Sequence, residues 1–226
     1  MELNKEIFEL LENFRDINSS IVIEEGSVIK SISEARNVLA SSVLDVEFPQ
    51  TFGIYDLREF LNVVRLVESP RLYFSDNYVM IADNTGRSSI KYFFTDTEML
   101  TKAPEKFKMP EAEVSFSFTN EDFSRVKRAA QALGHTELAV QPSNGAIKLT
   151  VQDSENPTSN TFSMDVDGTY PEGEDFCFIT NISNLKIQYN KNYKVEMSSK
   201  LISKYTSEEG QLEYFIALEK KSQYGA

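Results

Sequence analysis

The sequence of 226 residues contains one cysteine, one histidine and no tryptophan. The single cysteine, Cys177, excludes an internal disulfide framework and any zinc site built from several cysteines. The single histidine, His135, excludes metal sites that need two, and its position directly after Gly134 indicates a residue at a helix C-terminus. Because Cys177 lies between Phe176 and Phe178, we interpret it as a small buried apolar residue and not as a nucleophile.

The chain also lacks long apolar runs and catalytic motifs. No run approaches the roughly 18–20 residues that cross a bilayer, and acidic residues occupy the N-terminus, where a signal peptide has a basic region. We therefore expect a soluble, intracellular protein. Phosphate-binding glycine motifs and the G-x-S-x-G motif are absent, and Asp153-x-Glu155 lacks the other ligands of a calcium loop. We expect no enzyme, no metal site and no cofactor.

Acidic residues outnumber basic ones by 35 to 23, which gives a net charge of −12. Taken alone, this charge disfavours a nucleic-acid partner, because phosphate binding needs lysine and arginine. Net charge does not show where the charges lie, however, so the distribution of the basic residues decides the question. A hydrophobic fraction of 41%, with 16 Phe and 10 Tyr, is enough for a substantial core.

Apolar residues at helical spacing predict four helices, and turn residues separate strand-like runs. The predicted helices are Asn4–Phe14, a segment that begins at Asp56, a segment from Asn120 to Gly134, and a short one from Asn181 to about Gln188. The predicted strands are Ser20–Glu24, Ser27–Ile32, Val43–Phe48, Thr51–Tyr55, Arg71–Ser75, Tyr78–Ala82, Ser88–Phe94, Val114–Phe118, Leu138–Gln141, Ala146–Gln152, Thr161–Val166, Asp175–Ile179, Tyr193–Ser198 and Gln211–Glu219. Hairpin turns are predicted at Glu25-Gly26, Asp76-Asn77 and Asn144-Gly145.

The order of these elements repeats. A helix, a hairpin and a further strand follow Asp56, and the same series follows Asn120. We therefore predict an α+β fold of two similar domains, 1–110 and 111–226, each with two helices packed on antiparallel sheets. The stretch 95–110 contains Pro104, Pro110 and three lysines, which is typical of a surface connector.

Basic residues gather on the outer faces of the predicted helices. Arg58 and Arg65 lie on one line of the second helix, Arg125, Lys127 and Arg128 lie on the third, and Lys186 lies on the fourth. The outer line of the first helix is net acidic and does not follow this pattern. Two interpretations remain open: the basic faces contact a polyanion, or they only keep the helices soluble.

Short motifs along nearly the whole chain carry a resemblance to a known family. They include Asn13-Phe14, Ile54-Tyr55-Asp56-Leu57, Gly168-x-Tyr170, Phe176-x-Phe178-Ile179-x-Asn181-x-x-Asn184-x-Lys186 and Asn192-Tyr193-Lys194. In their order and spacing they resemble the sliding clamp of T-even-type bacteriophages, the processivity factor of the phage DNA polymerase. The region Leu100–Phe118 matches poorly.

The resemblance implies the DNA-clamp fold and a homotrimeric ring whose helices line a central hole. The implied partners are duplex DNA bound without sequence specificity, the phage DNA polymerase, a clamp loader ATPase and late transcription factors. No membrane partner is implied, the clamp itself hydrolyses nothing, and the expected location is the cytoplasm of the infected bacterial host.

The resemblance also assigns residues to three surfaces. The residues expected to face DNA are Arg58, Arg65, Arg125, Lys127, Arg128 and Lys186. Ser88–Phe94 is expected to pair with Thr161–Val166 of the neighbouring subunit, with Tyr92, Phe94, Thr161 and Ser163 at the contact. The residues expected to line a pocket for partner peptides are Ile32, Val38, Leu100, Phe215 and Leu218, although each is also typical of plain core.

A hypothesis of another class stays open at this point. An acidic virion or scaffold protein that binds only other proteins would have the same composition, and its basic helix faces would be incidental.

Overall fold

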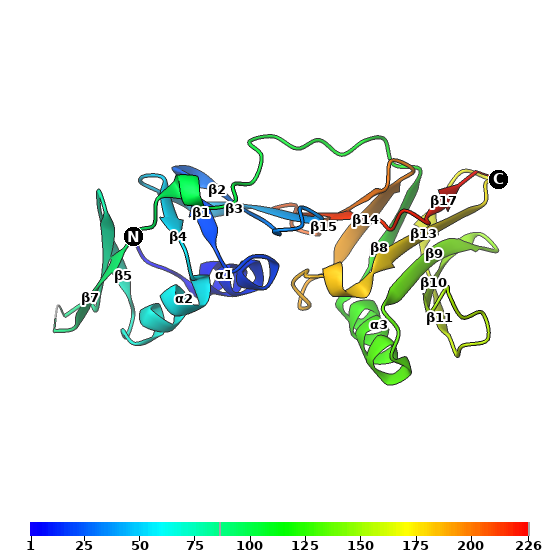
Figure 1. Ribbon diagram of the computed structural model, residues 1–226, viewed down its shortest axis with the longest axis horizontal. Coiled ribbons are helices and arrows are strands. Elements are labelled where there is room, and N and C mark those ends of the chain that lie inside the picture. The colour runs from blue at the N-terminus through cyan, green and yellow to red at the C-terminus, as the bar shows by residue number, and fades with distance from the viewer. Residues whose placement is uncertain (86, 226) are drawn as a thin grey trace. The chain divides into compact units, whose positions relative to one another are not determined.

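The computed structural model describes residues 1–85 and 87–225, which form α-helices and antiparallel strands (Figure 1). The chain divides into two compact units, Met1–Glu105 and Lys106–Ala226. The division falls inside the stretch expected to be a connector. Within the described ranges, the helices are too short or too polar to cross a membrane.

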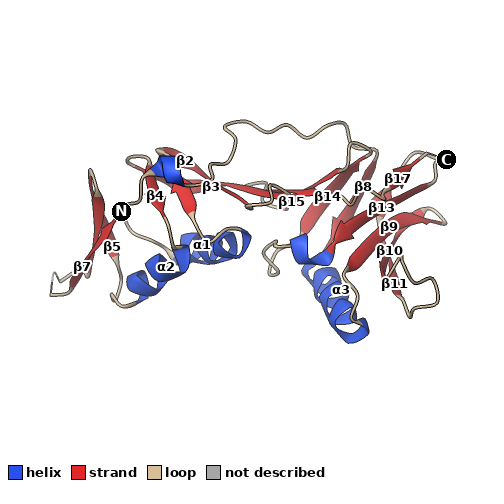
Figure 2. Cartoon of the chain, viewed as in Figure 1, coloured by secondary structure: helices blue, strands red, loops and turns tan. Residues whose placement is uncertain are grey.

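The first unit places two neighbouring helices, α1 (Lys5–Ile17) and α2 (Leu57–Arg65), on one side of its strands (Figure 2). The strands are β1 (Ile21–Ile23), β2 (Gly26–Ile32), β3 (Val38–Phe48), β4 (Phe52–Ile54), β5 (Arg71–Ser75), β6 (Tyr78–Ala82) and β7 (Ser89–Phe93), and a 3-10 turn, η1 (Thr97–Met99), follows them. β1 pairs with β4, β2 pairs with β3, and β5, β6 and β7 form a three-stranded sheet in that order.

Side-chain caps fix the starts of both helices in this unit. The side chain of Asn4 accepts a hydrogen bond from the backbone N–H of Ile7, and the side chain of Asp56 accepts one from Glu59. These bonds satisfy backbone donors that the first helical turn leaves without partners. The apolar face of each helix is buried toward the strands, with Phe14 of α1 fully buried.

The second unit has one α-helix, α3 (Asn120–Leu133), among the described residues. Thr119 and Asp122 form a reciprocal capping box at its start, and Gly134 ends it at φ 71°, a conformation that glycine adopts without strain. The strands are β8 (Val114–Phe118), β9 (Glu137–Ser143), β10 (Ala146–Gln152), β11 (Phe162–Val166), β12 (Gly168–Thr169), β13 (Phe176–Asn181), β14 (Tyr193–Ser198), β15 (Ile202–Ser207), β16 (Leu212–Ala217) and β17 (Gln223–Tyr224).

The strands of the second unit form two groups. One is a five-stranded sheet in the order β11-β10-β9-β13-β17. In the other, β12, β8, β14, β15 and β16 are hydrogen-bonded neighbours in that order. The predicted turn at Asn144-Gly145 is present, and positive φ angles of 44° and 87° there match a two-residue hairpin.

The fourth predicted helix is wrong. Only a 3-10 turn, η2 (Ile182–Asn184), occupies that segment. The Asn181 side chain accepts hydrogen bonds from the backbone N–H and hydroxyl of Ser183, a local pairing that competes with helix propagation. Ile182 and Ile187 are both buried, as expected of a chain wrapped into the core and not of an amphipathic helix. Among the described residues the first unit has the two expected α-helices, whereas the second unit has one.

The hairpin predicted at Glu25-Gly26 is also wrong, since β1 pairs with β4 and β2 pairs with β3. Gly26 does turn the chain, at φ 111°, but a turn residue does not determine which strand becomes the partner. The strand β15 was not predicted, because two of the three residues on its buried face are Ser203 and Ser207, which flank Tyr205, so the alternation of apolar and polar residues is weak.

Candidate functional site

The basic residues of α2 differ in their surroundings. Arg58 is exposed, and the described structure records no carboxylate paired with it. Arg65 forms an ion pair with Glu12 of α1, and its guanidinium lies 4.9 Å from the centroid of the Phe8 ring. Arg65 therefore helps to join α1 to α2, and its charge is partly neutralised.

On α3, the three predicted basic residues occupy one stretch of the helix. Arg125 pairs with Glu121 at 2.6 Å, one turn earlier. The Lys127 ammonium lies 5.6 Å from the centroid of the Phe123 ring, and Arg128 Nε donates to the Ser124 backbone oxygen at 3.4 Å. The charge of Arg125 is therefore partly neutralised, as is that of Arg65, whereas the contacts of Lys127 and Arg128 leave their positive charges in place for phosphate groups, which accept from lysine and arginine without regard to base sequence.

Lys186 follows η2 and is half-buried. The prediction that it lies on a helix face is wrong, because no helix forms there.

The part of the chain that the structure describes contains no candidate metal centre. No group of three or more histidine, cysteine, aspartate or glutamate side chains lies close enough to hold a metal ion. Burial raises the pKa of the half-buried Cys177 thiol, with the charges of Asp175 and Glu137 adding to this, so the thiolate form is disfavoured.

Strand β7 ends the three-stranded sheet of the first unit, and β11 ends the five-stranded sheet of the second. The Phe94 N–H donates to Asn77 and the Asp83 N–H donates to Ser88, so the even-numbered residues of this segment face β6. Ser89, Lys91 and Phe93 consequently turn their backbone groups to the open edge.

The same reasoning applies to β11. Ser143 and Ala146 flank the two-residue turn between β9 and β10, and in such a hairpin the flanking residues are hydrogen-bonded to each other. Backbone groups alternate in direction along a strand, so the even-numbered residues of β10 bond to β9 and the odd-numbered ones bond to β11. Ile147 opposes Val166, which leaves Ser163 and Asp165 with backbone groups directed to the open edge.

The four residues expected at the subunit contact lie on or beside these edges. Tyr92 is half-buried, with its ring 5.2 Å from that of Phe60, and its N–H faces β6. Phe94 is half-buried beside Phe52, whereas Thr161 and Ser163 are exposed.

The five residues expected to line a partner pocket belong to different units. Ile32, Val38 and Leu100 lie in the first unit, and Phe215 and Leu218 lie in the second. All except Ile32 are buried. In the second unit, the Phe107 ring covers Phe215 with 4.7 Å between ring centroids.

Around Leu100 the first unit has a pocket of about 250 Å³. Exposed Tyr55 and Met99 border it, together with Ser19, Ser20, Glu34, Asp56 and Thr101. Sequence patterns did not indicate Tyr55 or Met99. Each is a large side chain with an apolar body beside a helix cap or a polar turn. Such a residue points to a binding site only when the structure shows that its side chain is exposed.

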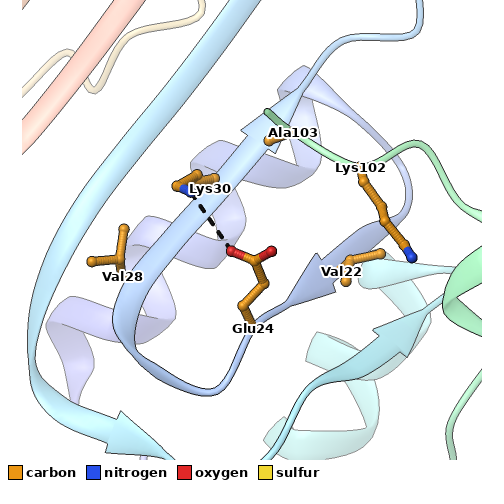
Figure 3. A pocket seen from close by; sticks show the side chains of 6 residues that line it. All are labelled: Val22, Glu24, Val28, Lys30, Lys102 and Ala103. Carbon is orange, nitrogen blue, oxygen red and sulfur yellow. Dashed lines mark ion pairs between the residues drawn. The ribbon is translucent and has the colours of Figure 1, made fainter. Parts of the chain in front are cut away.

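A second, smaller hollow shows how the connector begins. Lys30 forms an ion pair with Glu24 at 3.6 Å, in a hollow that Lys102 and Ala103 also line (Figure 3). The Lys30 ammonium also donates to the backbone oxygen of Glu105 at 2.9 Å. The first half of the connector is thus attached to β2.

Comparisons with known proteins show which family the chain resembles. The sliding clamp of Vibrio phage KVP40 is 32% identical over 224 residues, covering 97% of this chain and 99% of that protein. The chain belongs to the phage sliding clamp family. The sliding clamps of Escherichia phage RB69 and Enterobacteria phage T4 are each 28% identical and cover 98% of the chain. The family model "gp45 sliding clamp, C terminal" matches residues 115–220. The resemblance to T-even-type clamps is confirmed.

Solved structures confirm the DNA-clamp fold. The proliferating cell nuclear antigen of A. fulgidus, solved with the C-terminal region of FEN-1, has a TM-score of 0.69 at 12% identity and covers 96% of both chains. That of Entamoeba histolytica has a TM-score of 0.67, also at 12% identity, with 94% of both chains covered. A putative DNA polymerase III beta subunit from Eubacterium rectale has a TM-score of 0.63 at 14% identity, with 94% of this chain and 64% of that chain covered.

Proposed function

We propose that three copies of this chain form a ring that encircles duplex DNA and tethers the phage DNA polymerase during replication. The observation that carries the proposal is the concentration of basic side chains on α2 and α3 in a protein of net charge −12. Membership of the sliding clamp family and the clamp fold support it.

A ring that slides must hold DNA without reading its sequence. Contacts to base edges would create preferred positions and stall the ring, whereas contacts to phosphates bind every sequence similarly. Three chains at −12 carry −36 in total. DNA is therefore attracted only where Arg58, Lys127 and Arg128 and their neighbours offset the acidic surface.

Ring closure is proposed to occur where β7 of one copy pairs with β11 of the next. Both strands have five residues and an open edge, and edge strands of this kind pair readily with another chain. The repeated head-to-tail contact then generates a closed ring. A proline at Phe93 or Ser163 removes an N–H directed to this edge and should yield monomers. Proline at Tyr92 is a poor test, because its N–H faces β6.

Partner peptides are proposed to insert an aliphatic or aromatic anchor beside Ile32 and the connector. The polymerase, the clamp loader ATPase and the late transcription factors would take turns at this surface. Ile32 is the half-exposed residue of the five expected there, so Ile32→Ser should weaken binding of the polymerase's terminal peptide without disturbing the core. If Ile32→Ser binds the peptide normally, the pocket lies elsewhere.

In the second unit, Phe107 covers Phe215, which is one of the five residues expected to line the peptide pocket. Phe107→Ala should change the peptide affinity while leaving the mass of the ring unchanged. We further propose that the chain has no enzymatic activity of its own and works in the cytoplasm of the infected bacterial host.

The deciding experiment combines mass and topology. The wild-type chain should have a mass in solution near three times 25.7 kDa. After loading by the clamp loader with ATP, it should stay on nicked circular DNA and slide off linear DNA. A monomeric mass together with no retention on either DNA would favour an acidic scaffold protein. Equal retention on both DNAs would indicate ordinary binding without encirclement.

A further inference from the structure

Strands β7 and β11 each carry one exposed charge on the solvent face near their open edges. β7 presents Lys91 and β11 presents Asp165. Neither takes part in an ion pair within residues 1–85 and 87–225. The two charges are of opposite sign, and each lies on the edge through which we propose that copies join.

The Lys91 side chain is already ordered by aromatic rings. Its ammonium lies 3.8 Å from the centroid of the Tyr78 ring and 4.8 Å from that of Phe93. Such contacts attract the cation without neutralising it. Because the long side chain is restrained beforehand, a new ion pair there costs less side-chain entropy than a free surface lysine would lose.

Strand geometry restricts what Lys91 can oppose. In an antiparallel pair, directly opposed residues point to the same face of the sheet. Lys91 points to solvent, as do Ser163 and Asp165, whereas Met164 alternates with them on the other face. An alignment that pairs the middle residues of the two strands would place Lys91 opposite Met164. Because opposed residues share a face of the sheet, this alignment would turn the apolar side chains of one strand to solvent, and it is excluded.

Two alignments remain, with Lys91 opposite Ser163 or opposite Asp165. Both cover the half-exposed Ile90 and Tyr92 with apolar residues of β11. The Ser163 hydroxyl is already hydrogen-bonded to that of Thr150 at 3.0 Å. An opposite charge directly across the strands is the more favourable partner for Lys91.

We propose that Lys91 of one copy lies directly opposite Asp165 of the next copy and pairs with it, and that this contact sets the register in which the ring closes. The inference rests on the proposed ring. Lys148 of β10 is the cross-strand neighbour of Asp165, so the carboxylate would lie between two cations of different copies.

Charge reversal tests the attraction. A cross-strand ion pair changes the equilibrium constant of one contact by about fourfold. A closed trimer contains three contacts, so the trimer constant should change by about 60-fold and the midpoint concentration of assembly by about eightfold. Lys91→Glu and Asp165→Lys should each raise that midpoint by at least this factor in low salt, and the double variant should restore it. Lys200→Glu and Glu172→Lys change the net charge equally at exposed sites away from both edges and serve as controls.

The outcomes separate the inference from the ring on which it rests. If the single variants match their controls, or if the double variant is as weak as both changes combined, the ion pair is rejected while the ring stands. If the wild-type chain forms no trimer, the proposed function fails.

Crosslinking tests the register independently. Directly opposed residues that face one another across an antiparallel pair have Cα atoms about 5.5 Å apart, within the range that a disulfide spans. In a Cys177→Ala background, Lys91→Cys with Asp165→Cys should give covalent trimers on mild oxidation. Lys91→Cys with Ser163→Cys places the thiols diagonally and should crosslink poorly. Efficient crosslinking of the Ser163 variant alone would overturn the proposed register.

Discussion

The helices of the two units carry their charges differently. Helix α1 has four acidic and two basic residues and lies against α2, which has two basic residues and one acidic residue. Helix α3 has three basic residues and two acidic ones, and both acids lie in its first turn. In the first unit, Glu12 of α1 pairs with Arg65 of α2.

The difference shows that the number of basic residues on a helix does not measure its attraction for phosphate. On α3 the acidic residues serve the helix start, where they cap backbone donors and match the helix dipole. The basic residues one turn later are left with only one carboxylate partner among the described residues, at Arg125. In the first unit the neighbouring acidic helix offsets α2. The second unit should therefore supply more of the affinity for DNA.

The largest expected difference between the units appears at alkaline pH. Burial raises the pKa of Tyr193, Tyr205 and Tyr214 in the second unit far above the usual value near 10, and it raises the pKa of Tyr92 in the first unit to about 12. In the unfolded chain these hydroxyls lose their protons first. The stability they contribute is therefore complete below pH 10 and falls as the pH rises further.

At pH 11 each such tyrosine should cost about 1.4 kcal/mol, so the second unit should lose up to about 4 kcal/mol. Urea unfolding at pH 8.5 and pH 11 measures this loss. Tyr205→Phe should remove about a third of it, whereas Tyr189→Phe, at a side chain 76% exposed, should leave it unchanged. If Tyr205→Phe and Tyr189→Phe lose the same amount of stability between pH 8.5 and pH 11, the buried tyrosines do not cause the alkaline destabilisation.

The next largest effect concerns DNA. Replacing Arg125, Lys127 and Arg128 together with Glu should reduce processive synthesis more than tenfold at physiological salt. The logarithm of the DNA-binding constant falls linearly with the logarithm of the salt concentration, and the magnitude of this slope should decrease by about 0.9 for each phosphate that the variant no longer neutralises. Replacing Arg58 and Arg65 with Glu should have a smaller effect, because Arg65 is already paired. Both variants should keep the trimer mass. A greater loss of processivity from the α2 variant would reverse the comparison.

Removing a helix cap should lower the free energy of unfolding by a smaller amount, and this amount should differ between the two units. Thr119→Ala removes the hydroxyl that accepts from the Asp122 N–H and donates to the Asp122 carboxylate, whereas the backbone N–H of residue 119 keeps its bond to that carboxylate. The loss of the hydroxyl should destabilise the second unit by about 1–2 kcal/mol. Asp56→Ala breaks one bond and should cost the first unit about 0.5–1 kcal/mol. Thermal unfolding measures both, and Thr119→Ser, which keeps the hydroxyl, should restore most of the stability.

The elements predicted best from sequence were those whose signals are local. The strands Val114–Phe118 and Tyr193–Ser198 have the predicted bounds, and the caps at Asp56 and Gly134 are present. Each follows from side-chain alternation or from the chemistry of one turn. The same local reasoning failed at Asn181, where burial against the core decides the conformation.

The candidate site was predictable only in outline. Spacing along a helix placed Arg125, Lys127 and Arg128 correctly on one helix. It did not reveal that Arg65 meets Glu12, because those residues belong to different helices. Likewise, period-two alternation located β7 and β11, but pairing with β6 and β10 decided which residues face the open edges.

The smallest effect tests the pairing of Arg65 directly. Glu12→Gln keeps the shape of the side chain and removes its charge, so it frees the Arg65 guanidinium for phosphate. Because exposed ion pairs contribute only about 0–1 kcal/mol, we expect DNA binding to strengthen by about twofold to fivefold while stability changes little.

Glu9→Gln is the matched control, since Glu9 lies on the same helix and pairs with Lys5 instead. It changes the net charge equally without touching Arg65. Binding of the loaded ring to DNA should then respond more strongly to Glu12→Gln than to Glu9→Gln, and the excess should vanish when Arg65 is also replaced with Gln. If the two single variants behave alike, the weaker attraction of the first unit reflects the acidity of α1 as a whole and not this one contact.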